Sequence, residues 1–199
     1  MGYHRAWPDA DIVGIDNVPQ PDYPFTFIQA DLTINPPVDG SSFDFIHASP
    51  PCQSYSNMSN RYGSDQPELI AEVRSWIEAS GTLGVIENVT GAKAAMQNTI
   101  MLTGYHFGLA TWRPRLFEPV GFWLLSPPPA RGTSEVGIYG KPDGRRLWGS
   151  GRSQLTAWSS IEQGQRILEI DWTDDWHQLR EAIPPAYTEW IGNQLTGLL

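Results

Sequence analysis

Four short apolar segments, each followed by polar side chains, most constrain how this 199-residue chain can fold. They span residues 11–16, 25–31, 43–49 and 84–89. Short apolar runs bounded by turn-forming residues are typical of strands buried on both faces. A helical pattern over residues 65–80 separates the third run from the fourth. Strands that alternate with helices predict an α/β doubly wound sheet, in which ligands bind at the carboxyl ends of the strands.

The predicted helix at residues 65–80 has clear boundaries. Asp65 and Glu68 have the spacing of a capping box, and Gly81 follows the last residue of the pattern. A second helix is expected near the end of the chain, because apolar residues repeat at helical spacing over residues 186–199. This helix should pack back onto the core.

Composition and periodicity divide the chain into three parts. Residues 1–118 carry the predicted strands, whereas residues 119–175 are rich in proline, glycine and serine and show no clear periodicity. We therefore expect a main domain, a small irregular lobe, and a final segment over residues 176–199 that returns to the main domain. Four tryptophans are expected to form a small core of the lobe rather than to stack on bases. They are Trp148, Trp158, Trp172 and Trp176.

Composition excludes several classes of protein. A single cysteine cannot form an internal disulfide, and no run approaches the roughly 20 apolar residues that span a bilayer. We therefore expect a cytoplasmic protein that does not enter a membrane. The four histidines lack ligand spacing, so no structural metal is expected.

The net charge of −9 argues against nonspecific binding of nucleic acid over the whole surface. One segment has the opposite balance. Residues 130–160 contain five basic residues against two acidic ones. We therefore expect an acidic body with one basic lobe.

Carboxylates end the first two predicted strands. Asp16 follows the first strand and Asp31 the second. In nucleotide-cofactor folds, carboxylates at these places bind ribose hydroxyls and the exocyclic amine of adenine. The alternative for each residue is a solvated aspartate at the start of a loop.

The only cysteine follows two prolines, in the sequence Pro50-Pro51-Cys52. The prolines fix their φ angles and supply no N–H, so Cys52 should stand on a stiff loop at the ligand side of the sheet. At an ordinary pKa near 8.5, about 3 % of a thiol is ionised at pH 7, so a nucleophilic role requires a nearby positive group or hydrogen bonds. The alternative is a cysteine that packs as a small apolar residue.

Further candidates for chemistry lie downstream. Glu87 ends the fourth strand, where burial would raise its pKa and make it a proton donor. Arg113 and Arg115 alternate on a segment predicted to be extended, so they would share a face and could bind phosphate or a carbonyl oxygen. Surface charges at a strand edge are the alternative for this pair. A thiolate and a protonatable carboxyl in one pocket suit addition to an electron-poor ring.

These residues resemble the motifs of the cytosine-5 DNA methyltransferases, in the order and spacing of that family. Pro51-Cys52-Gln53 is similar to the nucleophile motif, Glu87-Asn88-Val89 to the glutamate motif, and Arg113-x-Arg115 to the end of the Gln-x-Arg-x-Arg motif. Residues 182–192 are similar to the closing motif of short, phage-type members. The resemblance covers nearly the whole chain outside residues 119–175, although Thr111 replaces the first glutamine of the arginine motif.

The resemblance implies a Rossmann-like class I methyltransferase sheet, with its catalytic domain at residues 1–118 and a target-recognition lobe at residues 119–175. It implies that Cys52 adds to C6 of a cytosine flipped out of double-stranded DNA, while Glu87 donates a proton to N3. The methyl group of S-adenosylmethionine would then pass to C5. Arg115, together with Arg113, would hold the flipped base and its phosphates.

The resemblance also implies binding residues. For S-adenosylmethionine they are Asp16 at the ribose, Asp31 at the adenine, and Pro50. For DNA they are Gln53, Ser54, Asn88, Arg145, Arg146 and Arg152. Such a protein would act in the cytoplasm of a bacterial or phage-infected cell.

The start of the chain departs from the family pattern. Members open with a strand and a loop of the form Asp-Leu-Phe-x-Gly-x-Gly-Gly, whereas residues 1–6 are similar to the helix after that loop. The corresponding strand would lie between residues 11–16 and residues 43–49 of this chain. Unless a second chain, an upstream segment or a rearrangement fills this gap, cofactor binding should be weak.

Two other functions fit parts of the pattern. A degenerate methyltransferase-like protein would bind DNA or a partner without catalysis, and S-adenosylhomocysteine would not raise its melting temperature. A cysteine hydrolase would need a histidine base near Cys52. His47 lies on the preceding strand, but no oxyanion-hole glycine pattern accompanies it.

Overall fold

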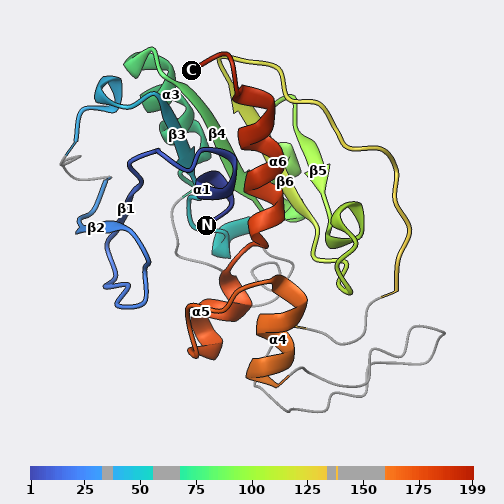
Figure 1. Cartoon of the computed structure of the whole chain (residues 1–199). Coiled ribbons are helices and arrows are strands. Elements are labelled where there is room, and N and C mark those ends of the chain that lie inside the picture. Colours follow the sequence, from blue (N-terminus) through green and yellow to red (C-terminus); the bar gives the residue numbers. More distant parts are fainter. Residues whose placement is uncertain (33–37, 56–67, 134–137, 139–159) are drawn as a thin grey trace. The chain divides into compact units, whose positions relative to one another are not determined.

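The computed structural model describes residues 1–32, 38–55, 68–133, 138 and 160–199, and within them the fold is α/β (Figure 1). The described strands are β1 (Val13–Asp16), β2 (Thr26–Gln29), β3 (Phe45–Ala48), β4 (Leu83–Asn88), β5 (Ile100–Leu102) and β6 (Arg115–Val120). The described α-helices are α1 (Gly2–Ala6), α3 (Ile70–Ser80), α4 (Ile161–Leu168), α5 (Trp176–Glu181) and α6 (Pro185–Leu195). The α/β class predicted from the sequence is therefore confirmed.

The described strands form two sheets rather than one continuous sheet. β1 and β2 pair in parallel. The second sheet has the order β3-β4-β6-β5, with β3 parallel to β4 and with β6 antiparallel to both of its neighbours. The four strands predicted from the sequence are all present, but β5 and β6 were not predicted.

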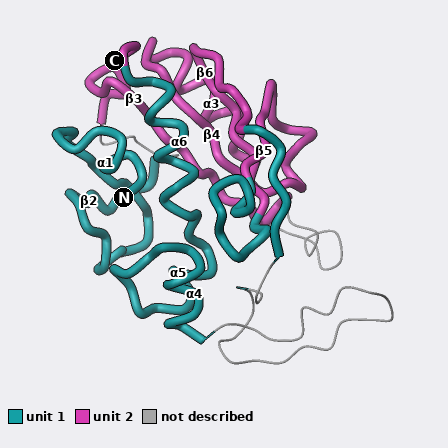
Figure 2. The backbone as a smooth tube through the Cα atoms, turned by 45° about the vertical axis from the view of Figure 1, so that its right-hand side comes forward, with its two compact units in different colours: residues 1–34, 103–113, 128–196 teal, residues 35–102, 114–127, 197–199 magenta. Residues whose placement is uncertain are grey.

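The chain divides into two compact units, each assembled from separate segments (Figure 2). Unit 1 comprises residues 1–34, 103–113 and 128–196, and unit 2 comprises residues 35–102, 114–127 and 197–199. The boundaries proposed above at residues 118 and 175 stay predictions.

In unit 1, α1 packs closely on α6. A Cβ atom on Gly2 would lie 2.0 Å from the carbonyl oxygen of Pro185, so only glycine allows this approach. On the facing helix, a Cβ on Gly192 would lie 2.6 Å from the Cβ of Ala6. The helix predicted near the end of the chain is therefore present, and it packs on α1.

Unit 1 also contains a helix in the segment expected to be irregular. Ser160 and Gln163 form a capping box at the start of α4, and Ile167 and Leu168 are buried at its end. They share an apolar cluster with Ile138, Ile170 and Leu179, against which Trp172 and Trp176 pack. The predicted core role is thus confirmed for these two tryptophans, whereas Trp148 and Trp158 lie outside the described residues.

In unit 2, α3 covers one face of the four-stranded sheet. Ile70 and Ile77 are fully buried in a cluster that includes Ile46 of β3 and Ile86 of β4. The helix ends before Gly81, whose φ of 71° is a left-handed conformation that favours glycine. The predicted helix and its end are confirmed, but its predicted start is wrong, because α3 begins at Ile70 and residues 68 and 69 are not helical. Residues 65–67 lie outside the described part of the chain.

An ion pair ties α3 to β6 on the same face. The guanidinium of Arg74 binds both carboxylate oxygens of Glu118, and its Nη2 atom also donates to the carbonyl of Ala95 at 2.9 Å. The side chain of Glu118 is 2 % exposed. Because a buried carboxylate is stable only when it is paired, Arg74 is what allows Glu118 to lie in a central strand.

Among the described residues, no helix is long and apolar enough to cross a membrane. The same residues contain no group of three or more histidine, cysteine, aspartate or glutamate side chains arranged to hold a metal ion.

Candidate active site

The carboxyl ends of β3 and β4 meet at one edge of the sheet in unit 2. The two strands are parallel and in register, with Ala48 beside Ile86. The chain that leaves β3 therefore enters the loop of Pro50, Pro51 and Cys52 at the same edge where β4 ends in Glu87 and Asn88. Ser49 directly follows β3 and Asn88 is the last residue of β4. These two residues are 39 positions apart in the sequence but lie at neighbouring strand ends. This edge is the candidate active site.

The loop that carries Cys52 is held on both sides. Before the cysteine, the buried side-chain amide of Asn88 donates to the carbonyl oxygen of Pro50 at 3.0 Å. After it, the N–H of Tyr55 donates to the carbonyl oxygen of Cys52 at 3.1 Å, within a 3₁₀ turn over Gln53–Tyr55. Cys52 itself is half-buried. The thiol is thus carried by a stiff loop and is not enclosed in the core.

Gly91 brings a second backbone contact to this loop. A Cβ on Gly91 would lie 2.0 Å from the carbonyl oxygen of Tyr55, so a larger residue would have to displace the chain. Gly91 belongs to a 3₁₀ helix over Thr90–Ala94 that directly follows β4. The last residue of β4 thus contacts the Cys52 loop at Pro50, and the segment after β4 approaches it at Tyr55. Sequence reasoning missed Gly91, for which the only signal was a glycine just after the glutamate motif.

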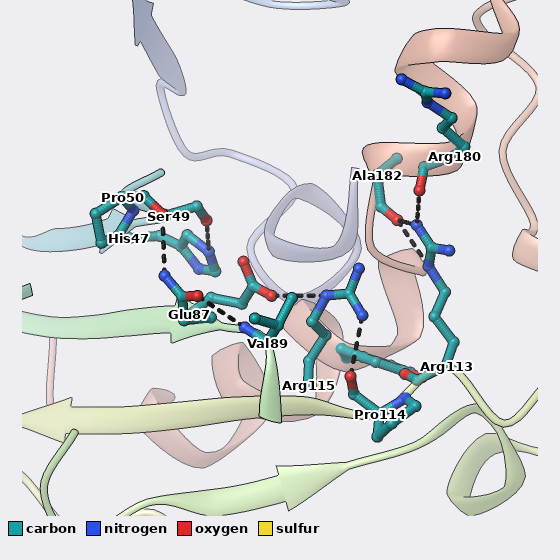
Figure 3. A network of polar contacts seen from close by, with 12 residues as sticks. His47, Ser49, Pro50, Glu87, Val89, Arg113, Pro114, Arg115, Arg180 and Ala182 are labelled. Carbon is teal, nitrogen blue, oxygen red and sulfur yellow. Dashed lines mark hydrogen bonds and ion pairs between the residues drawn. The ribbon is translucent and has the colours of Figure 1, made fainter. Parts of the chain in front are cut away.

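Glu87 pairs with Arg115 (Figure 3). Its neighbour Ile86 packs with α3, so Glu87 lies on the opposite face of β4. The Nε atom of Arg115 lies 3.0 Å from Oε1 of Glu87, and the two side chains are 13 % and 10 % exposed. Antiparallel pairing of β4 with β6 places Phe117 beside Glu87, and Arg115 is two residues earlier on the same face of β6. Burial disfavours the charged carboxylate of Glu87, whereas the guanidinium favours it.

His47 lies on the same face of the sheet, next to Val85 of β4. Its Nε2 atom is 3.1 Å from the hydroxyl of Ser49 (Figure 3). Its ring meets the ring of Phe117 edge-on at 6.4 Å between centroids. Loss of hydration on burial lowers the pKa of His47 to about 4. The imidazole is therefore neutral at pH 7, and it does not supply the positive charge that would ionise Cys52.

Arg113 does not share a strand face with Arg115, and that prediction is wrong. β6 begins at Arg115, whereas Arg113 has a φ of 30°, outside the extended region. Arg113 belongs to unit 1 and is 1 % exposed. Its guanidinium donates to the carbonyl oxygens of Ala182 and Arg180 at the end of α5 (Figure 3). Backbone acceptors from a distant helix, rather than strand alternation, determine where this side chain lies.

The two candidate cofactor carboxylates lie at one edge of the two-stranded sheet in unit 1. Asp16 is exposed at the end of β1, and the N–H of Ala30 donates to its backbone carbonyl at 3.0 Å, so the pairing continues as far as the residue before Asp31. Oδ1 of Asp16 accepts from the N–H of Val18 at 2.8 Å, and Oδ2 accepts from the side-chain amide of Gln20 at 3.4 Å. A carboxylate can accept about four hydrogen bonds, so Asp16 keeps capacity for hydroxyl groups.

The other predicted binding residues are placed as follows. Pro50 is buried in unit 2, Gln53 is exposed and Ser54 half-buried just after Cys52, and Asn88 is 1 % exposed. Arg145, Arg146 and Arg152 lie outside the described residues. The chain matches no model of a known protein family and no curated protein. Its function is therefore inferred from the geometry of the site and from the motifs.

Proposed function

We propose that the protein is a DNA (cytosine-5) methyltransferase with Cys52 as its nucleophile. The observation that carries the proposal is the convergence of three motif residues within unit 2. Cys52 follows β3, Glu87 ends β4 and Arg115 begins β6, so all three lie at one edge of one sheet. Addition to a pyrimidine uses a thiol, a carboxylic acid and a guanidinium together.

The nucleophile adds to C6 of a cytosine that has been turned out of the duplex, because the ring cannot be reached inside the base stack. The new bond joins Sγ of Cys52 to C6, and its formation makes C5 nucleophilic. When C5 later loses its proton, the bond to sulfur breaks and the thiolate leaves. Such an addition needs a thiol held at a constant position, which the contacts at Pro50 and Tyr55 provide.

Glu87 is the proposed proton donor to N3 of the same ring. Arg115 is the proposed partner that stabilises Glu87 and contacts the base. A proton on N3 withdraws electrons from the ring, which favours attack at C6. In the free protein, Arg115 stabilises the negative charge of Glu87. A bound base would exclude water from this edge and favour the protonated carboxyl. Arg115, with five N–H donors, can then turn part of its guanidinium to a carbonyl oxygen of the base.

S-adenosylmethionine supplies the methyl group when it is bound. The chemistry of Asp16 and Asp31 fits its nucleoside, since carboxylate oxygens accept hydrogen bonds from ribose hydroxyls and from an adenine amine. Pro50 is the proposed contact from the Cys52 loop. We also propose that the fold is a Rossmann-like class I methyltransferase sheet, because these cofactor contacts are those of that fold.

The proposed partner is double-stranded DNA. Gln53 and Ser54, next to the nucleophile, are the proposed contacts from unit 2. Arg145, Arg146 and Arg152 are the proposed contacts from the basic lobe. Asn88 was expected to touch DNA, but its buried amide on the carbonyl of Pro50 favours a role in positioning the Cys52 loop.

One experiment tests the function directly. The purified chain is incubated with methyl-labelled S-adenosylmethionine and mixed-sequence duplex DNA, beside Cys52→Ser. Label in the DNA from the parent chain alone supports catalysis. DNA retained on a filter without label from either protein favours the binding-only alternative. A hydrolase is disfavoured because His47, with a pKa of about 4, is a weak base at neutral pH.

A further inference from the structure

We infer that Trp112 and Tyr105 of unit 1 form a stacking platform for an unpaired nucleobase of DNA, with Arg131 as the cation for an adjoining phosphate. The inference deepens the proposed function and rests on it, because a cytosine turned out of the duplex uncovers the faces of the bases beside it. The motifs assign no role to these three residues. Binding at the platform can be measured without methyl transfer.

Trp112 presents much of its indole ring to solvent. The residue is 44 % exposed, whereas its neighbours Thr111 and Arg113 are buried. The indole lies against the ring of Tyr105, with 5.3 Å between the ring centroids and 53° between the planes. Aromatic rings attract one another in such arrangements beyond the effect of buried area alone. An indole that is supported by a second ring and is still exposed can therefore take a third ring from a ligand.

The backbone that carries the two rings forms a closed loop. The N–H of Gly104 donates to the carbonyl oxygen of Trp112 at 3.0 Å. A Cβ atom on Gly104 would lie 2.2 Å from the carbonyl oxygen of Thr111, so only glycine allows this approach. Tyr105 directly follows Gly104, in a 3₁₀ helix over Gly104–Phe107. These contacts fix the backbone of Trp112 next to that of Tyr105.

The 3₁₀ helix is itself held at both ends. The ring of Phe107 lies 5.3 Å from that of Tyr187 and 6.3 Å from that of Trp190, measured between centroids, and both partners belong to α6. At the other end, the N–H of Thr103 donates to Nδ1 of His106 at 3.1 Å. Because the platform is ordered before any ligand arrives, a base that stacks on it loses little binding free energy to ordering the protein.

The start of the basic segment, residues 130–160, packs on the platform. A Cβ atom on Gly132 would lie 2.5 Å from Cδ1 and 2.8 Å from Cγ of Tyr105, so the backbone at Gly132 covers part of this ring. Arg131 directly precedes Gly132 and is exposed. A cationic side chain is therefore attached beside the two rings. Proteins bind single-stranded nucleic acid with this combination, because bases stack on the rings while cations pair with phosphates.

The charge of the two segments that build the platform also suits a nucleic acid. The chain has 22 acidic residues and a net charge of −9, but residues 103–113 and 128–133 contain no aspartate or glutamate. No carboxylate of these segments would therefore repel a phosphate. In a paired duplex the faces of the bases are covered by their neighbours. We therefore expect the platform to take a base only where the stack is interrupted.

Binding of single-stranded DNA to the full chain tests the platform. The probe is a fluorescein-labelled oligonucleotide of mixed sequence, and anisotropy gives its affinity. We expect Trp112→Leu to weaken binding about 5- to 150-fold, the loss for one stacked base, and Trp112→Phe to restore most of it. Trp123→Leu, at a tryptophan of unit 2 that is 87 % exposed, is the matched control and should bind as the parent chain does.

Three results of this titration would overturn the inference. They are an absence of single-strand binding by the parent chain, equal affinities of the parent chain and Trp112→Leu, and equal affinities of Trp112→Leu and Trp112→Phe. A fourth comes from competition with a free deoxynucleotide at the same concentration of bases. If the deoxynucleotide competes as well as the single strand does, the platform is a site for nucleotides and not for DNA.

Arg131→Gln tests the phosphate contact separately from the ring. We expect the slope of log K against log salt to decrease in magnitude by about 0.7 in Arg131→Gln, the value for one phosphate of a single strand. The slope should stay unchanged in Trp112→Leu, because stacking releases no counterions. An unchanged slope in Arg131→Gln overturns the assignment of this cation.

A crosslink to the parent chain decides the question even if Trp112→Leu does not fold. A single strand that contains 5-iodouracil is irradiated with the protein, and the crosslinked peptide is identified by mass spectrometry. We expect the crosslink at Trp112 or Tyr105, and a crosslink found only elsewhere overturns the inference. Methyl transfer is scored independently. A chain that methylates DNA but binds single strands without Trp112 keeps the proposed function and loses this inference, and the reverse result keeps the platform alone.

Discussion

The Nε atom of Arg115 lies 3.0 Å from Oε1 of Glu87, and this ion pair joins the ends of two antiparallel strands at the candidate site. Glu87 belongs to the glutamate motif and Arg115 to the arginine motif, which are separate in the sequence. Because both side chains are largely buried, the permanently charged guanidinium of Arg115 favours the carboxylate form of Glu87. The pair thus couples the proposed proton donor to the residue that would hold the base.

Replacing Glu87 with glutamine removes the acid but keeps an oxygen for Arg115. We expect Glu87→Gln to lower the rate of methyl transfer about 10²- to 10⁴-fold, since a general acid contributes about that much. We also expect a loss of about 1–3 kcal/mol in the free energy of unfolding, because a charge-assisted hydrogen bond is weakened. Steady-state kinetics and urea unfolding measure the two effects. Glu72→Gln, on the exposed side of α3, is the control, and an unchanged rate in Glu87→Gln would remove Glu87 from the mechanism.

The loop of Cys52 should depend on Asn88. Asn88→Ala leaves the carbonyl of Pro50 without its donor, so we expect a loss of about 1–3 kcal/mol in unfolding free energy and a slower methyl transfer. The only cysteine of the chain makes the loop directly measurable, because iodoacetamide reports Cys52 alone. We expect alkylation of Asn88→Ala to be several-fold faster. Asn193→Ala, at an exposed position of α6, should react at the parent rate.

Gly91→Ala tests the same loop from its other end. The added methyl would lie 2.0 Å from the carbonyl oxygen of Tyr55, and a backbone atom cannot be moved without moving the loop. We expect a loss of about 1–3 kcal/mol from overpacking and a changed alkylation rate at Cys52. If both variants alkylate at the parent rate, these contacts do not position the thiol.

The strands β3 and β4 and the two longest helices could be predicted because their signals are local. β3 and β4 are continuous apolar runs, and α3 ends at a glycine with positive φ. β6 gave no such signal, because it contains Glu118 and Pro119. Glu118 is acceptable there only because Arg74, 44 residues earlier, neutralises it. Pro119 is acceptable because β5 pairs with β6 only as far as Phe117, so no bond to β5 is lost at the proline.

In the candidate site, too, some residues could be predicted from local sequence and others could not. Cys52 and Glu87 were identified by their short motifs and by their places after strands, which are local features. Arg113 was misplaced because its acceptors on Ala182 and Arg180 are 69 and 67 residues away. Tyr187 was assigned to a helix face, and its hydroxyl bond to Arg113 has no signature in the sequence. Local patterns thus predict which residues stand at strand ends, but not the partners that distant segments provide.

His47 should make stability depend on pH. Its pKa is about 4 in the folded chain and near 6.5 when unfolded, so the unfolded state binds more protons between these values. Stability therefore falls as the pH decreases from about 6.5 to 4, by up to about 3 kcal/mol from this residue. His47→Gln should remove that part of the dependence. Urea unfolding at pH 7.5 and 4.5 measures it, and equal pH dependence in the two proteins would show that His47 is not the group responsible.

Asp16 gives the most direct test of the proposed cofactor. Oδ1 of Asp16 accepts from the N–H of Val18, and Oδ2 is the oxygen better placed for a ribose hydroxyl. Asp16→Asn can keep the first bond with its amide oxygen, but its NH₂ group cannot accept from a hydroxyl. We therefore expect the fold to persist and the affinity for S-adenosylhomocysteine to fall at least about tenfold, the value of one charge-assisted hydrogen bond. Asp9→Asn, at an exposed position, is the matched control.

Calorimetric titration of the three proteins distinguishes the outcomes. Binding by the parent chain and Asp9→Asn that is weakened in Asp16→Asn places the ribose at the end of β1. Equal binding by all three would move the cofactor away from this strand, because the loss of a charged acceptor must weaken any hydroxyl that it binds. Absence of binding by the parent chain, with DNA still retained, would favour the binding-only function. The nucleoside contacts of unit 1 can thus be tested separately from the chemistry at Cys52 and Glu87 in unit 2.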